Sequence, residues 1–279
     1  MLRIEDIRIR DPFILTDCEN GCYYMYGTTA LVDGSIAAKN TFSVYRSRDL
    51  VHFEEPKVVF DGARNNYWAT RDYWAPEVHA YNGKYYLFGT GYAEGKCRGT
   101  NIFVCDTPDG DFRPLSDHAI TPLDWECLDG TFFVEDGVPY MVFSHEWLQV
   151  GNGEICAIEL SKDLSQAVGA PFCLFRASDN PDVSEINGAG SGQYVTDGPF
   201  LYREDGKIKM IWSSFYAGRY LVLEAESDRL AGPWKHSGSR FDFDGGHAML
   251  FETLGGERMI SLHRPNAPHD AERAFFCKF

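Results

Sequence analysis

Residues 74–89 read Trp-Ala-Pro-Glu-Val-His-Ala-Tyr-Asn-Gly-Lys-Tyr-Tyr-Leu-Phe-Gly, and this stretch decides the fold class. Two short runs of aromatic and β-branched residues flank Asn82-Gly83, a dipeptide that favours the tight turn of a β-hairpin. The stretch therefore predicts two antiparallel strands joined by a two-residue turn. Helical patterns are scarce in the rest of the chain, so the sequence predicts an all-β fold.

The same unit occurs five times along the chain. An Asp- or Pro-containing start leads into an apolar strand, then a turn rich in Asn, Asp and Gly, then a second strand. The other copies lie at residues 11–27, 128–144, 196–213 and 246–263. Successive copies are roughly 50 to 70 residues apart, which fits a four-stranded propeller blade with its loops. We expect a five-bladed β-propeller with up to four strands in each blade.

The fifth copy is followed by only one more apolar run, Ala274-Phe-Phe-Cys-Lys-Phe. A propeller hides its sheet edges by closing the ring, and residues 2–9 have the alternating pattern of a strand. We expect this N-terminal segment to complete the fifth blade. No linker-like composition divides the chain, so residues 1–279 are predicted to form a single domain.

Composition narrows the possible partners. The chain has 41 acidic and 26 basic residues, a net charge of −15 and no cluster of Lys and Arg, so we expect neither a nucleic acid nor a membrane partner. The N-terminus lacks the apolar core of a signal peptide. The eight cysteines are scattered without paired CxxC units, which favours free thiols. We expect a cytoplasmic protein unless a leader segment precedes this sequence.

Acidic residues recur where the repeats begin. Asp11, Glu77, Asp129 and Asp197 mark four of the five copies, and His247 marks the fifth. The innermost strand of each blade runs along the central channel, so residues at one repeat position should meet at one face. A single Asp before Pro or Gly is commonly a turn residue, but turn residues need not share a repeat position. Convergent carboxylates are the groups that glycoside hydrolysis requires.

Five segments in this order resemble the family 43 glycoside hydrolases, which are arabinanases, arabinofuranosidases and β-xylosidases. The segments are Arg10-Asp-Pro-Phe-Ile, Trp74-Ala-Pro-Glu-Val, Leu128-Asp-Gly, Thr196-Asp-Gly-Pro-Phe and Asp244-Gly-Gly-His. The resemblance spans essentially the whole chain. It implies a five-bladed propeller and an inverting mechanism, in which one carboxylate activates water and another protonates the leaving oxygen.

The same resemblance implies a role for each aspartate. Asp11 matches the general base, and Asp129 matches a second aspartate that orients the acid and raises its pKa. Asp197 falls where the family carries its general acid, although the family usually has Glu at that position. Glu146, in His145-Glu-Trp, is the alternative acid or a ligand of the substrate, and a plain rim residue is equally open.

His247 matches a histidine that in many family members helps to hold a hydrated cation at the propeller hub. Calcium is the expected ion, because oxygen ligands and water would supply most of its shell, and the chemistry does not require it. A buried histidine without a ligand is the alternative. Trp74, Trp147, Glu77 and Arg264 are expected to contact the sugar by stacking or hydrogen bonding, with core packing or a surface turn as the alternatives.

These features predict an O-glycosyl hydrolase that is inverting and exo-acting and removes arabinose or xylose from plant-derived oligosaccharides. An oligosaccharide is the expected partner. A catalytically reduced sugar-binding propeller is one alternative, because Asp stands at position 197. A glycoside phosphorylase of related fold is the other, and it would need several basic residues around a phosphate. The sequence leaves the choice of sugar, the linkage and the oligomeric state open.

Overall fold

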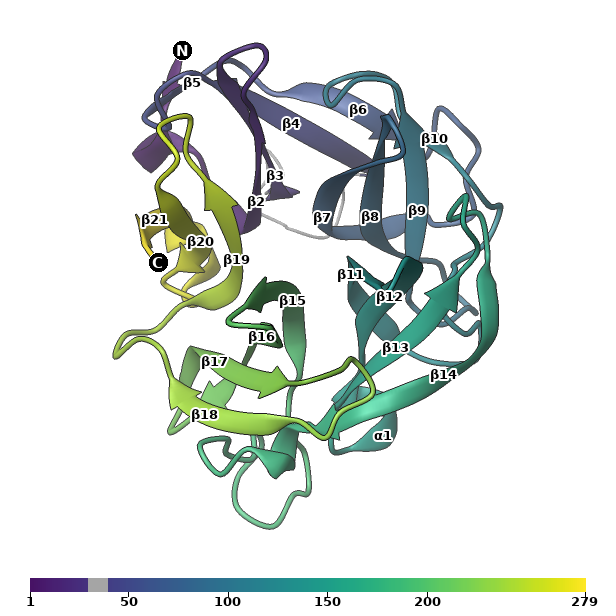
Figure 1. The fold of residues 1–279 in the computed structure, drawn as a ribbon, viewed down its shortest axis with the longest axis vertical. Coiled ribbons are helices and arrows are strands. Elements are labelled where there is room, and N and C mark those ends of the chain that lie inside the picture. The colour runs from purple at the N-terminus through teal and green to yellow at the C-terminus, as the bar shows by residue number, and fades with distance from the viewer. Residues whose placement is uncertain (30–39) are drawn as a thin grey trace.

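Five antiparallel sheets follow one another along the chain and surround a central axis, as the ring of ribbons in Figure 1 shows. The computed structural model describes residues 1–29 and 40–279. The five-bladed β-propeller expected from the repeats is confirmed, because each repeat forms the inner hairpin of one blade.

Within each blade the strands are arranged from the axis outward, mostly in chain order. The first blade contains β2 (Ile9–Asp17), β3 (Cys22–Thr29), β4 (Thr41–Ser47), β5 (His52–Phe53) and β6 (Lys57–Asp61), with β1 (Leu2–Arg3) at its edge. The second contains β7 (Arg71–Tyr81), β8 (Lys84–Tyr92), β9 (Gly99–Cys105) and β10 (Arg113–Pro114). The third contains β11 (Cys127–Glu135), β12 (Val138–His145), β13 (Glu154–Leu160) and β14 (Ala167–Arg176).

The last two blades are built in the same way. The fourth contains β15 (Asp197–Glu204), β16 (Lys207–Tyr216), β17 (Arg219–Ser227) and β18 (Lys235–Ser239), and the fifth contains β19 (Gly246–Glu252), β20 (Arg258–Arg264) and β21 (Arg273–Lys278). The helices are short: η1 (Ile4–Asp6), α1 (Trp147–Val150), η2 (Ala177–Asp179) and η3 (His269–Ala271). Among residues 1–29 and 40–279, no helix is long and apolar enough to cross a membrane.

Tight turns join the inner strands where the sequence places Asn-Gly or Asp-Gly. Asn82 and Gly83 have φ angles of 48° and 75°, and Asp136 and Gly137 have φ angles of 49° and 80°. Two successive positive φ angles make the turn whose twist matches that of the flanking strands. The predicted hairpin at residues 74–89 is therefore confirmed, and its turn chemistry fixes the pairing of β7 with β8.

The apolar core lies between neighbouring blades. Fully buried side chains such as Phe103, Phe143, Trp212 and Leu262 belong to four separate clusters of the described residues, each formed where blades meet face to face. Burying one such side chain stabilises the fold by about 1.5–3 kcal/mol. Because both faces of a blade are covered in this way, the packing holds the inner strands in place around the axis.

The N-terminal segment closes the ring differently from the expectation. β1 pairs with β5 in the first blade, and η1 follows it directly. Arg8 forms a single antiparallel bridge to Arg273 of β21 in the fifth blade, and the Arg273 side chain donates a hydrogen bond to the Glu5 carbonyl over 2.7 Å. The predicted closing strand over residues 2–9 is therefore wrong, because Leu2 and Arg3 pair in the first blade and Ile4–Asp6 form η1.

Candidate active site

A bulge opens the inner strand of every blade. The pairing of the two inner strands shifts register near the start of each blade, close to the axis. One residue in each bulge has a positive φ: 53° at Asp11, 44° at Ala75, 57° at Asp129, 50° at Gly198 and 52° at His247. Such bulges re-aim side chains. The same repeat position is thereby turned toward the axis in all five blades.

The repeat position expected for two of the acids is wrong. In the second blade the bulge position holds Ala75, and Glu77 lies two residues further along β7. In the fourth blade the bulge position holds Gly198, and Asp197 lies one residue before it. Bulge geometry therefore places Asp197 near the axis in a different way from Asp11.

Hydrogen bonds between neighbouring blades hold the bulges. The backbone N–H of Ala75 donates to the Thr28 hydroxyl over 2.8 Å, and that of Asp129 donates to the Thr90 hydroxyl over 3.0 Å. The N–H of Gly198 instead donates to Oδ2 of Asp129 over 3.0 Å. The side chain of Asp129 is thus part of the frame that joins the third and fourth blades.

A pocket of about 500 Å³ opens at the axis beside these bulges. This volume lies within the range of sites that enclose a small ligand. Seven of the predicted site residues line it: Asp11, Trp74, Asp129, Glu146, Trp147, Asp197 and His247. The structure therefore brings together residues from all five blades.

Asp11 is a buried carboxylate among donors and cations. The Thr28 hydroxyl donates to its Oδ2 over 2.8 Å, and Nδ1 atoms of His247 and His263 lie 3.2 and 3.4 Å from its Oδ1. Burial alone would raise the pKa of Asp11. The His247 ring, the hydrogen bond from His263 and the Arg10 guanidinium outweigh burial and hold the pKa well below its usual range. Asp11 is therefore ionised.

Asp197 has the opposite electrostatic surroundings. It is partly buried, and the Tyr220 hydroxyl donates to its Oδ2 over 3.1 Å. Burial and then the neighbouring Asp129 carboxylate raise the pKa of Asp197 to about 7. Burial and then Asp11 raise the pKa of Asp129 as well. One pocket thus contains an ionised carboxylate and a carboxyl that keeps its proton near neutral pH, a pairing typical of an acid and a base.

Glu146 lies at the rim, where β12 ends and α1 begins. Its Oε2 accepts a hydrogen bond from Nη1 of Arg98 over 2.8 Å. The same guanidinium pairs with Asp72 over 3.0 Å and lies over the indole of Trp74, with Cζ 4.6 Å from the ring centroid. Burial raises the pKa of Glu146, and Arg98 acts against that rise. An ion-paired Glu146 is better suited to accept hydrogen bonds than to release a proton.

Comparison with known proteins decides the family. The sequence profile of the family 43 glycosyl hydrolases matches residues 4–276. The chain belongs to this family. It is therefore a glycosyl hydrolase, and the resemblance drawn from its sequence motifs is confirmed.

Solved structures agree with this assignment. An endo-arabinase from Bacteroides thetaiotaomicron is 40% identical, with 100% of this chain and 96% of that chain covered and a TM-score of 0.91. An α-L-arabinofuranosidase from Lactobacillus brevis is 19% identical, with 100% and 94% covered and a TM-score of 0.77. An endo-1,4-β-xylanase from Bacteroides thetaiotaomicron is 23% identical, with 98% and 91% covered and a TM-score of 0.77. The last two show a likeness of fold alone. A comparison with curated proteins found no match.

Two predicted substrate ligands of this family 43 enzyme lie away from the pocket wall. Glu77 is buried beneath it, where its Oε2 accepts a hydrogen bond from Thr131 over 2.6 Å and faces Nε2 of His79 at 2.9 Å. Arg264 lies over the rings of Phe243 and Phe275 at 4.0 and 5.0 Å. Both predictions are corrected, because each side chain is taken up by contacts within the propeller.

Other residues of the family 43 enzyme were not predicted as site residues, although they shape its pocket. Arg98 holds Glu146 and Trp74, and Tyr220 donates to Asp197. Arg10 lies beside Asp11, with 3.8 Å between Nε and Oδ1, and its Nη1 donates to Glu272 over 2.5 Å. The sequence offered a signal only for Arg10, which precedes the Asp11-Pro12 motif directly. The other two come from strands and loops that the repeat pattern does not align with the axis.

The expected hub cation fits the residues around His247 poorly. His247 does lie at the axis, as predicted, and its Nδ1 faces the carboxylates of Asp11 and Asp129 at 3.2 and 3.7 Å. Calcium takes six to eight oxygen ligands, whereas His247 offers nitrogen. Within the described residues, no cluster of three close ligand atoms from His, Cys, Asp or Glu includes His247. The family 43 enzyme therefore shows no protein cage for calcium in its described part.

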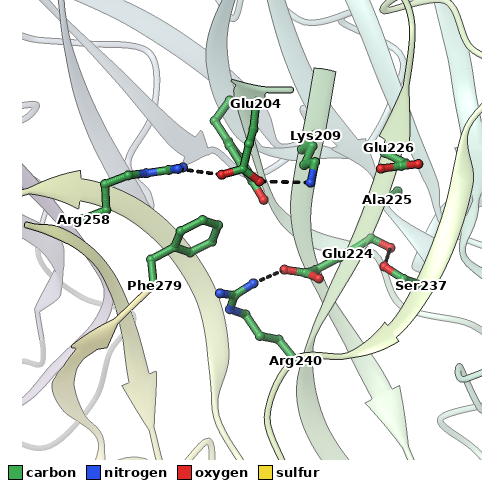
Figure 2. A pocket seen from close by; sticks show the side chains of 10 residues that line it. Glu204, Lys209, Glu224, Ala225, Glu226, Ser237, Arg240, Arg258 and Phe279 are labelled. Carbon is green, nitrogen blue, oxygen red and sulfur yellow. Dashed lines mark hydrogen bonds and ion pairs between the residues drawn. The ribbon is translucent and has the colours of Figure 1, made fainter. Parts of the chain in front are cut away.

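A second cavity, of about 390 Å³, lies between the fourth and fifth blades (Figure 2). Its charged side chains are paired: Arg258 donates to Glu204 over 2.6 Å, and Arg240 donates to Glu224. The Phe279 ring packs against both arginines, with Cζ atoms 4.1 and 4.4 Å from its centroid. None of the predicted site residues lines this cavity, so we assign no chemistry to it.

Proposed function

We propose that this family 43 enzyme hydrolyses arabinose- or xylose-containing oligosaccharides with inversion, using Asp11 as general base and Asp197 as general acid. One observation carries the proposal: two carboxyl groups of a single pocket have pKa values shifted in opposite directions. The pKa of Asp11 is lowered, and that of Asp197 is raised to about 7. Inverting hydrolysis needs one carboxylate to accept a proton and another to donate one.

The chemical step assigns one proton transfer to each group. Asp11 takes a proton from a water molecule, and the water oxygen attacks the anomeric carbon. Asp197 gives its proton to the glycosidic oxygen as the bond between that oxygen and the anomeric carbon breaks. Asp129 favours the protonated form of Asp197 through its negative charge. The product leaves with the opposite anomeric configuration, and proton exchange with water resets both carboxyl groups.

We propose that side chains at the rim of the pocket bind the sugar. Trp74 and Trp147 line the pocket and offer apolar faces on which a sugar ring can stack. Arg98 fixes the Trp74 indole on one side and Glu146 on the other. Glu146 can then accept hydrogen bonds from sugar hydroxyl groups while remaining paired.

We propose exo action as the first candidate, because a pocket of about 500 Å³ at the axis suits the end of a chain better than its middle. Endo action is the second candidate. The observation that favours it is the 40% identity to a structure described as an endo-arabinase. Product sizes from arabino- and xylo-oligosaccharides separate the two, because exo action releases single sugars from the first turnovers and endo action releases a ladder of fragments.

The acid assignment is tested with two variants and two leaving groups. Asp197→Asn and Glu146→Gln are assayed on nitrophenyl glycosides and on alkyl glycosides or disaccharides. Loss of the acid should lower kcat by about 10²–10⁴ on the poor leaving group and much less on nitrophenol, which departs without a proton. The proposal expects this difference for Asp197→Asn. Equal losses for Asp197→Asn together with the difference for Glu146→Gln would exchange the two roles.

Hydrolysis assays with and without inorganic phosphate distinguish our proposal from the two alternative functions. A sugar-binding module would bind oligosaccharides without hydrolysing any of them. A phosphorylase would require inorganic phosphate for turnover and would release a sugar phosphate. Our proposal expects hydrolysis in phosphate-free buffer at the same rate as in phosphate buffer.

A further inference from the structure

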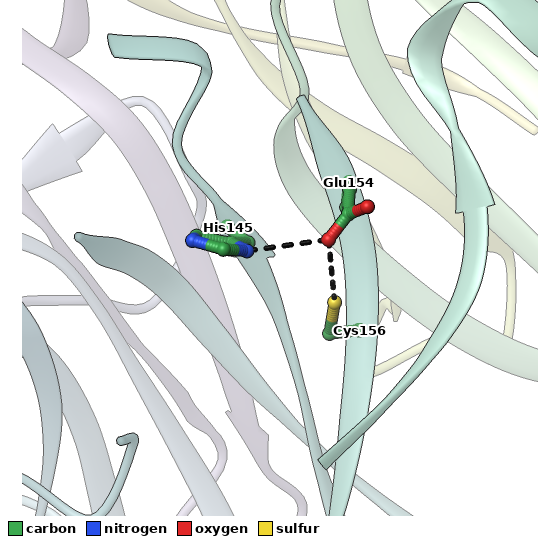
Figure 3. Close-up of side chains that lie close together, drawn as sticks. All are labelled: His145, Glu154 and Cys156. Carbon is green, nitrogen blue, oxygen red and sulfur yellow. Dashed lines mark hydrogen bonds and ion pairs between the residues drawn. The ribbon is translucent and has the colours of Figure 1, made fainter. Parts of the chain in front are cut away.

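Three ligating side chains meet on one face of the third blade, away from the pocket (Figure 3). His145 ends β12, and Glu154 and Cys156 lie two residues apart on β13, so their side chains share a face. Nδ1 of His145 lies 3.2 Å from Oε2 of Glu154, and Sγ of Cys156 lies 3.9 Å from the same oxygen. The three ligand atoms all lie within 4.8 Å of one another.

These separations are close to those of a tetrahedral zinc site. Zinc binds nitrogen and oxygen at about 2.0–2.2 Å and thiolate sulfur at about 2.3 Å, so in a tetrahedron a nitrogen and an oxygen ligand lie about 3.3–3.5 Å apart and a sulfur and an oxygen ligand about 3.5–3.7 Å apart. The His145–Glu154 distance lies about 0.1 Å below the first range, and the Cys156–Glu154 distance lies about 0.2 Å above the second. Zinc binding would therefore draw the Cys156 thiol toward the other two ligand atoms.

Outer contacts orient the ligand atoms inward. Nε2 of His145 faces Oε1 of Gln149 at 2.9 Å. The Gln149 amide is fixed, because its Oε1 accepts from the Glu126 N–H and its Nε2 donates to the Asp124 carbonyl. His145 must therefore carry a proton on Nε2, which leaves Nδ1 to face the cluster. A histidine that ligates metal usually donates its other N–H in this way.

The glutamate is oriented in the same manner. Nη2 of Arg176 donates to Oε1 of Glu154 over 2.9 Å, which leaves Oε2 directed at His145 and Cys156. The ring of Trp125 stacks on His145, with centroids 4.1 Å apart and planes at 11°. Both side chains that could ligate through nitrogen and oxygen are thus held by a second partner.

A candidate fourth ligand, outside the cluster of three close ligand atoms, lies on the neighbouring strand. Cys173 of β14 is paired directly with Cys156, and residues that oppose each other on antiparallel strands point to the same face. Cys156 is fully buried, whereas Cys173 is exposed at the outer edge of the blade. Cys173 would complete a tetrahedron and give the ion a path from solvent.

We propose that His145, Glu154, Cys156 and Cys173 form a zinc(II) site. Binding releases the two thiol protons to the buffer, while His145 keeps its proton on Nε2 and ligates through Nδ1. The ion would join β12, β13 and β14 at the end of the blade where Glu146 follows His145. This site is separate from the proposed hydrolysis, so either proposal can fail alone.

Titration of the metal-free protein tests the site without any sugar. The full chain is reduced, stripped of metal and titrated with zinc(II) chloride against a chromophoric chelator, and with cobalt(II) for its absorption spectrum. The proposal expects one equivalent bound and the intense absorption of tetrahedral, thiolate-ligated cobalt. Gln149→Ala should weaken binding by about 10–100-fold, because it removes only an outer contact.

Matched cysteine variants make the result specific. Cys156→Ser and the exposed Cys173→Ser should each lose the zinc equivalent, while Cys18→Ser, another exposed cysteine, should keep it. Circular dichroism checks that each variant is folded, and Cys173→Ser serves if the buried variant is not. Absence of binding, unchanged binding in both variants, or a Cys156–Cys173 disulfide that excludes the metal from the isolated protein would overturn the proposal.

Discussion

Asp11 combines a strained backbone with a stabilised charge. A non-glycine residue at a φ of 53° costs about 1–3 kcal/mol unless the surroundings impose it, and such residues cluster at functional sites. The surroundings here are the Thr28 hydroxyl, two histidine rings and Arg10, which together keep the carboxylate ionised. This residue is therefore placed and charged to accept a proton.

Asp11→Asn should abolish most turnover while keeping the fold. Asn tolerates a left-handed backbone as Asp does, but an amide cannot accept a proton from water. We expect kcat to fall by at least about 10²–10⁴, with sugar binding retained. Steady-state kinetics, isothermal titration with an oligosaccharide and circular dichroism measure the three properties. Activity close to that of the wild type would show that Asp11 only shapes the strand.

The pH profile should follow Asp197. Its pKa is raised to about 7, so the acid is protonated below that pH and loses its proton above it. We expect kcat/KM to fall as the pH rises through about 7. The Tyr220 hydroxyl donates to the Asp197 carboxylate and favours its ionised form, so Tyr220→Phe should move the alkaline limb to higher pH. A limb that stays in place or moves to lower pH would contradict the assignment.

At the scale of the strand, each of these bulges is held in place by a hydrogen bond to a neighbouring blade. Thr28 serves both parts, because its hydroxyl donates to Asp11 and accepts from the Ala75 N–H. Thr90 makes the equivalent contact between the second and third blades, where its hydroxyl accepts a hydrogen bond from the Asp129 N–H. The contact between the first two blades and the surroundings of Asp11 are therefore coupled through the single hydroxyl group of Thr28.

Thr28→Val and Thr90→Val separate these effects. Each leaves a buried backbone N–H without a partner, so each should lower the free energy of unfolding by about 1–3 kcal/mol. Only Thr28→Val also removes a donor to Asp11, so its kcat should fall more than that of Thr90→Val. Denaturant unfolding and kinetics on one substrate compare the two. Equal losses of activity would mean that Thr28 contributes nothing beyond the frame.

The repeat pattern predicted the five blades, but it did not predict which acidic residues occupy the bulge position. Hairpin turns and apolar strands recur locally, so the sequence alone gave the five blades correctly. The bulge position is marked in three blades by Pro12, Pro76 and Pro199, which each follow the residue with positive φ. Aligning these prolines would have placed Ala75 and Gly198 at the axis. An alignment on the acidic residues instead misplaces Glu77 by two residues and Asp197 by one. The strand pairing that reveals such an offset cannot be derived from the sequence pattern alone.

The repeat pattern could not predict contacts between distant segments, for a different reason. Arg98 reaches Glu146 because its blade packs against the third, and no local sequence rule encodes that approach. The closing strand was misplaced for a similar reason. An alternating segment can pair with any free edge, and residues 2–3 pair with β5 in the first blade.

At the scale of the whole molecule, five blades converge on one pocket, and the ring itself supplies the geometry. Carboxyl groups from the first, third and fourth blades line this pocket, and inverting hydrolysis requires a sugar and a water molecule to fit between the acid and the base. Blade packing maintains this arrangement, since four apolar clusters fill the contacts between blades in the described part of the chain.

Calcium should therefore leave turnover unchanged. The described residues around His247 offer no oxygen cage, and the chemical step uses only carboxyl groups and water. We expect the same kcat in calcium-free buffer and in buffer with millimolar calcium. A kcat that rises with calcium and saturates would show that a hub cation takes part in the reaction.

Inversion at the anomeric carbon is the most direct test of the account. A proton NMR spectrum is recorded in the first moments of hydrolysis of an α-L-arabinofuranoside or a β-D-xylopyranoside, before the released sugar mutarotates. A water molecule activated by Asp11 and a leaving oxygen protonated by Asp197 predict that the first sugar released has the anomeric configuration opposite to that of the substrate. A first product with the configuration of the substrate would mean that a carboxylate attacks the sugar directly, and it would contradict the roles assigned to Asp11 and Asp197.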